Sequence, residues 1–145
     1  MRRIVPRADS RFTLAEDGQG IEAMVLGVRD FHECYDAVSY HPEDPANWWL
    51  AFGTAEVLGE RAIRHAAFEN RPLLLVETPA KWLTLVGPDG PEASCIVDWR
   101  CDPRLILPFV SEIECESSAL RDRLLKSIAQ HARPPFKISV SRHAA

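Results

Sequence analysis

The chain has 145 residues, of which 46% are apolar and 26% charged, and its formal net charge at pH 7 is −4. This composition is typical of globular proteins, and a chain of this length buries roughly 68 to 70% of its unfolded surface, enough for a core without disulfides or metal ions. No apolar run approaches the ~18 residues of a membrane span, and no signal-peptide core follows the first residues. We therefore expect one globular domain over residues 1–145, cytoplasmic and without membrane contact.

Charge is distributed unevenly along the sequence. Residues 12–60 contain ten acidic side chains and one arginine, whereas four arginines lie in the first eleven residues and six basic residues follow position 116. One interpretation is that the basic ends pack against the acidic half and lower its self-repulsion. The other is an acidic surface that attracts a basic partner in a salt-sensitive complex. A nucleic-acid surface is not expected, because the basic residues are not interleaved with aromatic ones.

The first forty residues are expected to form strands joined by turns. The clearest strand pattern covers residues 22–28, and residues 17–20 have the composition of a tight turn.

Residues 45–69 are expected to form the longer of two helices. Asp44 is a suitable N-cap, and Pro45 at the first helical position loses no hydrogen bond there. Small residues recur at offsets of three and four, which places them on one helical face. They are Ala51, Ala55, Gly59, Ala62 and Ala66. Such a stripe allows close packing, including packing against a second copy in a homodimer.

Strand patterns return after this helix. A buried central strand is expected at 73–76, and segments 81–86 and 93–98 are expected to form a hairpin around the turn residues 87–91. The apolar run 105–107 is interrupted by a proline and is expected at an edge or bend.

The C-terminal third contains the second helix. Residues 112–116 alternate as a half-buried strand does, and the helix is expected at 118–132, capped by Ser117 or Ser118. Its apolar face consists of Leu120, Leu124, Leu125 and Ile128. A last strand is expected at 136–140.

These elements predict an α+β domain with a mainly antiparallel or mixed sheet and two principal helices, 45–69 and 118–132, packed on it. Strict alternation of strands and helices is not expected, and the seven glycines form neither G-x-G-x-x-G nor G-x-x-x-x-G-K. A doubly wound nucleotide-binding fold is therefore not expected.

The candidate catalytic residues are His32, Cys34 and His41. Imidazole moves protons near neutral pH and can convert a nearby thiol into a nucleophilic thiolate. The alternative is that Cys34 is a small core residue. A zinc site combining these three with Cys95, Cys101 or Cys115 lacks the usual short ligand spacings, so no metal and no cofactor are expected.

The candidate partner-binding residues are Trp49 and Val57. On a helix Trp49 points away from the small-residue face, and an exposed tryptophan is a common interface anchor. The alternative is that another segment of the chain covers it.

Two functions follow from these patterns. The first is a small bacterial accessory protein that binds another protein or a second copy of itself. A bacterial source is indicated by fourteen arginines against three lysines, as in GC-rich genomes. The second is a small enzyme or small-molecule-binding domain that uses the region of His32, Cys34 and His41.

Overall fold

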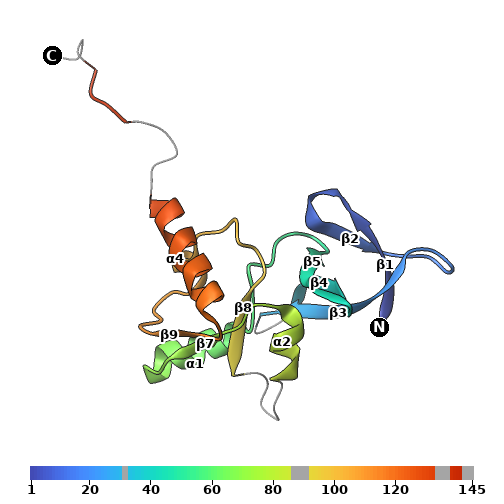
Figure 1. Cartoon of the computed structure of the whole chain (residues 1–145), viewed down its shortest axis with the longest axis horizontal. Helices are drawn as coiled ribbons and strands as arrows, with labels where there is room; N and C mark the ends of the chain where they lie inside the picture. The colour runs from blue at the N-terminus through green and yellow to red at the C-terminus, as the bar shows by residue number, and fades with distance from the viewer. Residues whose placement is uncertain (31–32, 86–91, 133–137, 142–145) are drawn as a thin grey trace.

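The structure, a computed structural model, describes residues 1–30, 33–85, 92–132 and 138–141. A five-stranded closed barrel is followed by a four-stranded sheet that carries the longer helices (Figure 1). The predicted α+β class with a mixed sheet is confirmed. No helix in these described ranges is long and apolar enough to cross a membrane.

The barrel consists of the first five strands in the spatial order β1-β2-β5-β4-β3. Their bounds are β1 Arg2–Arg7, β2 Arg11–Leu14, β3 Ile21–Arg29, β4 Cys34–His41 and β5 Asp44–Leu50. Neighbouring strands are antiparallel except β2 and β5, which meet in parallel at the single pair Arg11 and Leu50. A short 3-10 turn, Ala8–Ser10, connects β1 to β2.

Side chains of the barrel strands alternate between two environments, as the two-residue period of a strand requires. One set, centred on Ile4, Phe12 and Ala23, packs together. The other set includes Val28 and Val38 and packs against the second sheet. The barrel therefore buries side chains on both of its surfaces.

The second sheet has the strand order β6-β8-β7-β9. Strands β7 and β8 are parallel, as are β7 and β9, whereas β6 and β8 are antiparallel. Helices occupy the connections between strands, so this half has a local β/α alternation that the sequence patterns did not predict. The bounds are β6 Val57–Leu58, α1 Glu60–Glu69, β7 Leu73–Leu75, α2 Pro79–Thr84, β8 Ala93–Ile96, α3 Pro103–Ile106, β9 Ile113–Cys115 and α4 Ser118–Ala132.

The two faces of this sheet are covered differently. Leu73, Leu75 and Ile96 belong to a cluster with residues of α1, α3 and α4. Val76 and Cys95 belong to a cluster that contains residues of the barrel and of α2. The barrel thus packs on one face of the second sheet, and one apolar cluster includes residues of both.

The predicted helix at 45–69 is wrong for its first half. Residues Asp44–Leu50 form strand β5, in which Tyr40 pairs with Trp48 and Ser39 with Trp49. Aromatic residues favour strands, and pairing with β4 supplies the backbone hydrogen bonds that a helix would otherwise provide. Helix α1 begins only after Gly59, whose φ of 84° is unsuited to a helix interior.

This correction divides the stripe of small residues. Ala62 and Ala66 are buried on α1 against the chain's own sheet, whereas Ala51 and Ala55 lie outside any helix. The stripe is therefore not a continuous helical surface that a second copy could contact.

Two further element predictions are corrected. The segment expected to start a hairpin at 81–86 overlaps helix α2, which Thr78 caps with a side chain that accepts from the Lys81 amide. The run 105–107 overlaps helix α3, capped in the same way by Asp102. The hairpin turn at 87–91 and the start of the strand at 136–140 lie outside the described residues, and 138–140 form no regular element.

The predictions are confirmed for helix α4 and for strands β3, β7, β8 and β9. Of the predicted apolar face of α4, Leu120 and Leu124 are buried and Ile128 packs at the margin of the same cluster, whereas Leu125 is 57% exposed. The cap is Ser117, whose hydroxyl oxygen accepts from the amide of Leu120 at 3.1 Å.

We expect Ser117→Ala to lower the free energy of unfolding by about 1 kcal/mol, the usual loss for an N-cap serine. The Ser117 hydroxyl also donates to the carboxylate of Glu77, so the substitution removes a second contact. The matched control is Ser118→Ala, whose side chain is exposed. Chemical denaturation of both variants checks this, and an equal loss from both would contradict the assignment of Ser117 as the cap.

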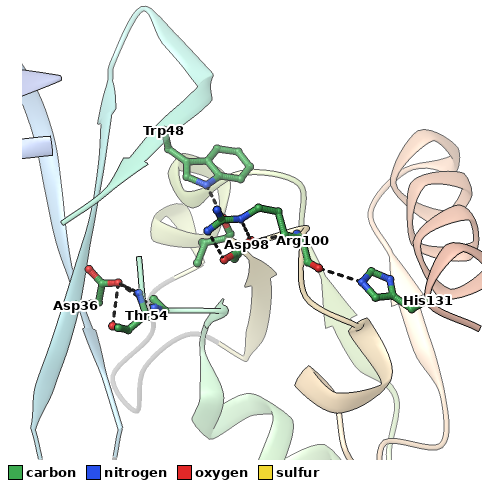
Figure 2. A network of polar contacts seen from close by, with 8 residues as sticks. Asp36, Trp48, Thr54, Asp98, Arg100 and His131 are labelled. Atoms are coloured by element: carbon green, nitrogen blue, oxygen red, sulfur yellow. Dashed lines mark hydrogen bonds and ion pairs between the residues drawn. The ribbon is translucent and has the colours of Figure 1, made fainter. Parts of the chain in front are cut away.

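The carboxylate of Asp36, in barrel strand β4, forms hydrogen bonds with the segment that leads into the second sheet. Its side chain, 2% exposed, accepts from the amides of Ala37, Phe52, Thr54 and Ala55 at 2.8–2.9 Å. Burial opposes ionisation, but these backbone hydrogen bonds outweigh it and lower the pKa of Asp36 below its ordinary value. Figure 2 shows the carboxylate facing Thr54.

Candidate functional site

A cleft of about 500 Å³ lies between the barrel and the end of β8. The barrel side contributes residues from the β1–β2 turn and from β5, and the other side contributes residues 97–100 and Arg123 of α4. A smaller cavity of about 220 Å³ shares Ala46, Trp48 and Arg123 and continues to Glu77 and Thr78 after β7. The cleft therefore follows the carboxyl ends of two parallel strands, where ligands of open α/β sheets commonly bind.

The barrel wall of the cleft contains an unusual backbone turn. Asp9 and Ser10 have φ values of 60° and 56°, in the left-handed region that few residues other than glycine adopt. Such conformations cluster at functional sites, because the surrounding structure must hold them. The turn delivers Arg11 to the cleft, and a Cβ atom at Gly53 would lie 2.5 Å from its guanidinium carbon. Gly53 therefore provides the space that Arg11 occupies.

The opposite wall contains an ion pair that is already complete. The guanidinium of Arg100 donates to both carboxylate oxygens of Asp98, at 3.0 and 2.9 Å (Figure 2). The Asp98 side chain is 9% exposed, and the hydrogen bond from Arg100 lowers the pKa of Asp98. The charge of Arg100 is thus balanced within the chain.

Arg123 of α4 also lines the cleft and forms no ion pair with a described residue, although the nearby carboxylate of Glu77 favours its charged form. Its guanidinium carbon lies 4.2 Å from the ring centroid of Trp99, a cation–π arrangement. Burial lowers the pKa of Arg123, but a guanidinium stays charged under all ordinary conditions. Within the described ranges neither Arg123 nor Arg11 forms an ion pair.

Trp48 fixes the two walls relative to each other. Its indole Nε1 donates to the carbonyl of Val97 at 2.9 Å, a bond between β5 and the chain just after β8. Figure 2 shows the indole above the ion pair of Asp98 and Arg100. The Nε1 of Trp99 is buried and has no partner among the described residues. The cleft therefore combines two indoles with two arginines that form no ion pair among the described residues, and its lining also includes Asp9.

The charged side chains that line the described part of the cleft are arginines and aspartates. The described lining residues include three arginines and two aspartates but no histidine, cysteine, lysine or tyrosine. The excess of positive charge is local, since the whole chain carries a net charge of −4.

The structure does not bring the predicted catalytic residues together. Cys34 and His41 are the two ends of the eight-residue strand β4, so their Cα atoms lie about 23 Å apart along the strand. Cys34 is exposed, His41 accepts from the Glu43 amide within a turn, and His32 lies outside the described residues. Cys34 and His41 cannot act on the same substrate atom within one molecule.

The other cysteines do not gather with Cys34 or His41 as metal ligands in the described part of the chain. All four cysteines are free, and burial raises the pKa of the Cys95, Cys101 and Cys115 thiols, which disfavours the thiolate form. Across residues 1–30, 33–85, 92–132 and 138–141, no three histidine, cysteine or acidic side chains gather as metal ligands.

The predicted partner-binding pair is also divided by the fold. Trp49 is half-buried and packs with the cluster of Ile4 and Phe12. Val57 is 7% exposed and belongs to the core beneath α1. Trp49 is therefore partly covered by the barrel strands, and Val57 is almost fully buried.

Sequence analysis did not single out the residues that line the cleft. Trp48 lies within the range 45–69 that was expected to be helical, and Arg11 and Arg123 lie within the basic ends of the sequence. The one available signal was the gathering of arginines at both ends of an acidic chain. Comparison with models of known families, with curated proteins and with solved structures finds no match to this chain.

Proposed function

We propose that this chain is a binding domain for a small anionic ligand that has a planar apolar part. The observation that carries the proposal is that Arg11 and Arg123 enter one cleft from opposite walls, each without an ion-pair partner in the described part of the chain. Guanidinium groups suit carboxylate, phosphate and sulfonate groups because of their planar fork of donors.

The shape of the cleft supports a small molecule. Its volume of about 500 Å³ is within the range of ~300–1,000 Å³ that is common for ligand pockets. The indoles of Trp48 and Trp99 offer flat apolar surface beside the arginines. The proposed contacts are therefore an anionic group at the arginines and a planar group along the indoles.

Naphthalene-2-sulfonate is a suitable probe, because its charge does not change between pH 4 and 10 and its ring is planar. We expect saturable binding to the whole chain by isothermal titration calorimetry, weakened by added salt. The neutral naphthalene-2-sulfonamide should bind at least about tenfold more weakly, because one charge-assisted contact contributes about 1.5–3 kcal/mol. Equal affinities for the two compounds would contradict the proposal.

A second candidate function is binding of a protein partner, the accessory role expected from the sequence. It is favoured by Phe109, which is 92% exposed although its φ of 63° is strained for a bulky residue. Leu105, 77% exposed, lines a cavity with three acidic residues, Asp30, Glu56 and Glu60, and with Arg64, which pairs with Glu60. The excess of acidic residues suits a basic partner with apolar side chains. Sedimentation of Phe109→Ser against the wild type tests self-association through this surface, and identical monomeric behaviour would exclude a homodimer there.

The proposed setting is the bacterial cytoplasm, where thiols stay reduced. Four free cysteines, one of them exposed, agree with that compartment. The proposal involves no cofactor and no catalytic step.

A further inference from the structure

His131, near the end of α4, contacts two backbone carbonyl groups at once. Its Nδ1 lies 2.8 Å from the carbonyl oxygen of Ser127, one turn earlier in the helix. Its Nε2 lies 3.0 Å from the carbonyl oxygen of Arg100, in the wall of the cleft. Figure 2 shows the imidazole between α4 and this wall.

The chemistry of the two partners determines the state of the ring. A carbonyl oxygen only accepts hydrogen bonds, so each ring nitrogen must donate. Neutral imidazole carries one N–H and would leave its other nitrogen lone pair facing a carbonyl lone pair. Both contacts are therefore satisfied only by the doubly protonated ring, whose positive charge is also favoured at a helix C-terminus.

We propose that His131 is a proton-dependent clamp that holds the cleft wall at Arg100 to helix α4 through two hydrogen bonds when protonated and through only one of them when neutral. The consequence for ligand binding rests on the function proposed above. The residue held at the clamp is the one whose side chain pairs with Asp98 in the cleft. Protonation of His131 therefore determines how firmly the wall at Arg100 is held against α4.

The charged groups around His131 support protonation. The carbonyls of Ser127 and Arg100 raise the pKa of His131 above its ordinary value of about 6.5, and the carboxylate of Asp102 acts in the same direction. Arg104, on α3, opposes them. Because the pKa is higher in the folded chain, the clamp's contribution is complete below pH ~6.5 and is lost as pH rises through the folded pKa.

The clamp is tested first on the ligand-free chain by NMR. We expect the His131 imidazole to titrate above pH 6.5, and the backbone amides of Arg100 and Cys101 to shift with the same midpoint. In His131→Gln this transition of the two amides should disappear, whereas the control His65→Gln on α1 should keep it. Amides that do not follow His131, or a midpoint at or below 6.5, would overturn the clamp.

Naphthalene-2-sulfonate then tests the link to binding, since the probe itself does not titrate. We expect its affinity to be about fivefold higher at pH 5.5 than at pH 8.5, the size of one hydrogen bond, and to become independent of pH in His131→Gln. Binding that is independent of pH in the wild type would overturn the link while leaving the proposed function in place. If the probe does not bind but the amides follow His131, the clamp is supported and the proposed function fails.

Discussion

Replacing Asp36 by asparagine is expected to lower the free energy of unfolding by about 3 kcal/mol, because buried donors would lose their charged acceptor. Oδ1 accepts from the amides of Ala37 and Phe52, and Oδ2 from those of Thr54 and Ala55. Whichever way an asparagine amide is oriented, its NH₂ group would face two N–H donors. Urea denaturation measures the loss.

The matched control is Asp17→Asn in an exposed turn, where we expect a change within about 0.5 kcal/mol. The stability of the wild type and that of Asp36→Asn should also depend differently on pH in the acid range. The pKa of Asp36 is lower in the folded chain, so its contribution is present above the ordinary aspartate value and is lost as pH falls through the folded pKa. A stability difference between wild type and Asp36→Asn that does not shrink at low pH would contradict this role for the carboxylate.

Arg123→Gln is expected to weaken binding of naphthalene-2-sulfonate about tenfold or more. The substitution removes one of the two cationic groups that lack an ion-pair partner in the described part of the cleft, and it removes the cation–π contact with Trp99. Arg11→Gln should have a similar effect, because the second cationic group is then missing. Calorimetric titration of each variant measures the change.

The matched control for Arg123→Gln is Arg121→Gln on the same helix. Arg121 is exposed and lines a different cavity, beside Cys115 and Ser118. Circular dichroism and thermal unfolding should be nearly the same for both variants, which separates loss of the site from loss of the fold. Equal affinities in the two variants would show that the probe binds outside the cleft.

Elements with a complete local pattern could be predicted from the sequence. Helix α4 has a capping serine followed by apolar residues at helical spacing, and Leu120 and Leu124 are buried as that spacing requires. Strand β7 is an unbroken apolar run, and Leu73 and Leu75 are indeed almost fully buried in a central strand. In both cases the local pattern and the tertiary packing favour the same structure.

A capping residue followed by proline did not always begin a helix, because pairing with a distant strand competed with helix formation. The pairs Thr78-Pro79 and Asp102-Pro103 begin helices α2 and α3, but Asp44-Pro45 begins strand β5. At β5 the next residues are tryptophans that pair with β4, and the Asp44 side chain accepts from the side chain of Asn47 instead of from a helix amide. A capping signal therefore identifies a permitted start, and long-range pairing decides whether the helix forms.

The cleft could not be predicted because its parts are far apart in the sequence. Arg11, Trp48 and Trp99 come from three segments that only the packing of the barrel on the second sheet brings together. By contrast, Cys34 and His41 are close in sequence, yet an extended strand separates them. Proximity in sequence was thus a poor guide to the site.

The most direct test of the anionic-ligand cleft is a ¹⁵N–¹H NMR titration with naphthalene-2-sulfonate that follows the indole N–H signals of the four tryptophans. Trp48 and Trp99 line the cleft, whereas Trp49 packs inside the barrel cluster and Trp82 bonds to the Ala93 carbonyl on α2's side of the sheet. We predict saturable shifts of the Trp48 and Trp99 signals that Arg123→Gln suppresses, with those of Trp49 and Trp82 nearly unchanged. Shifts largest at Trp82 or Trp49, or no saturable shift at any tryptophan, would contradict the account.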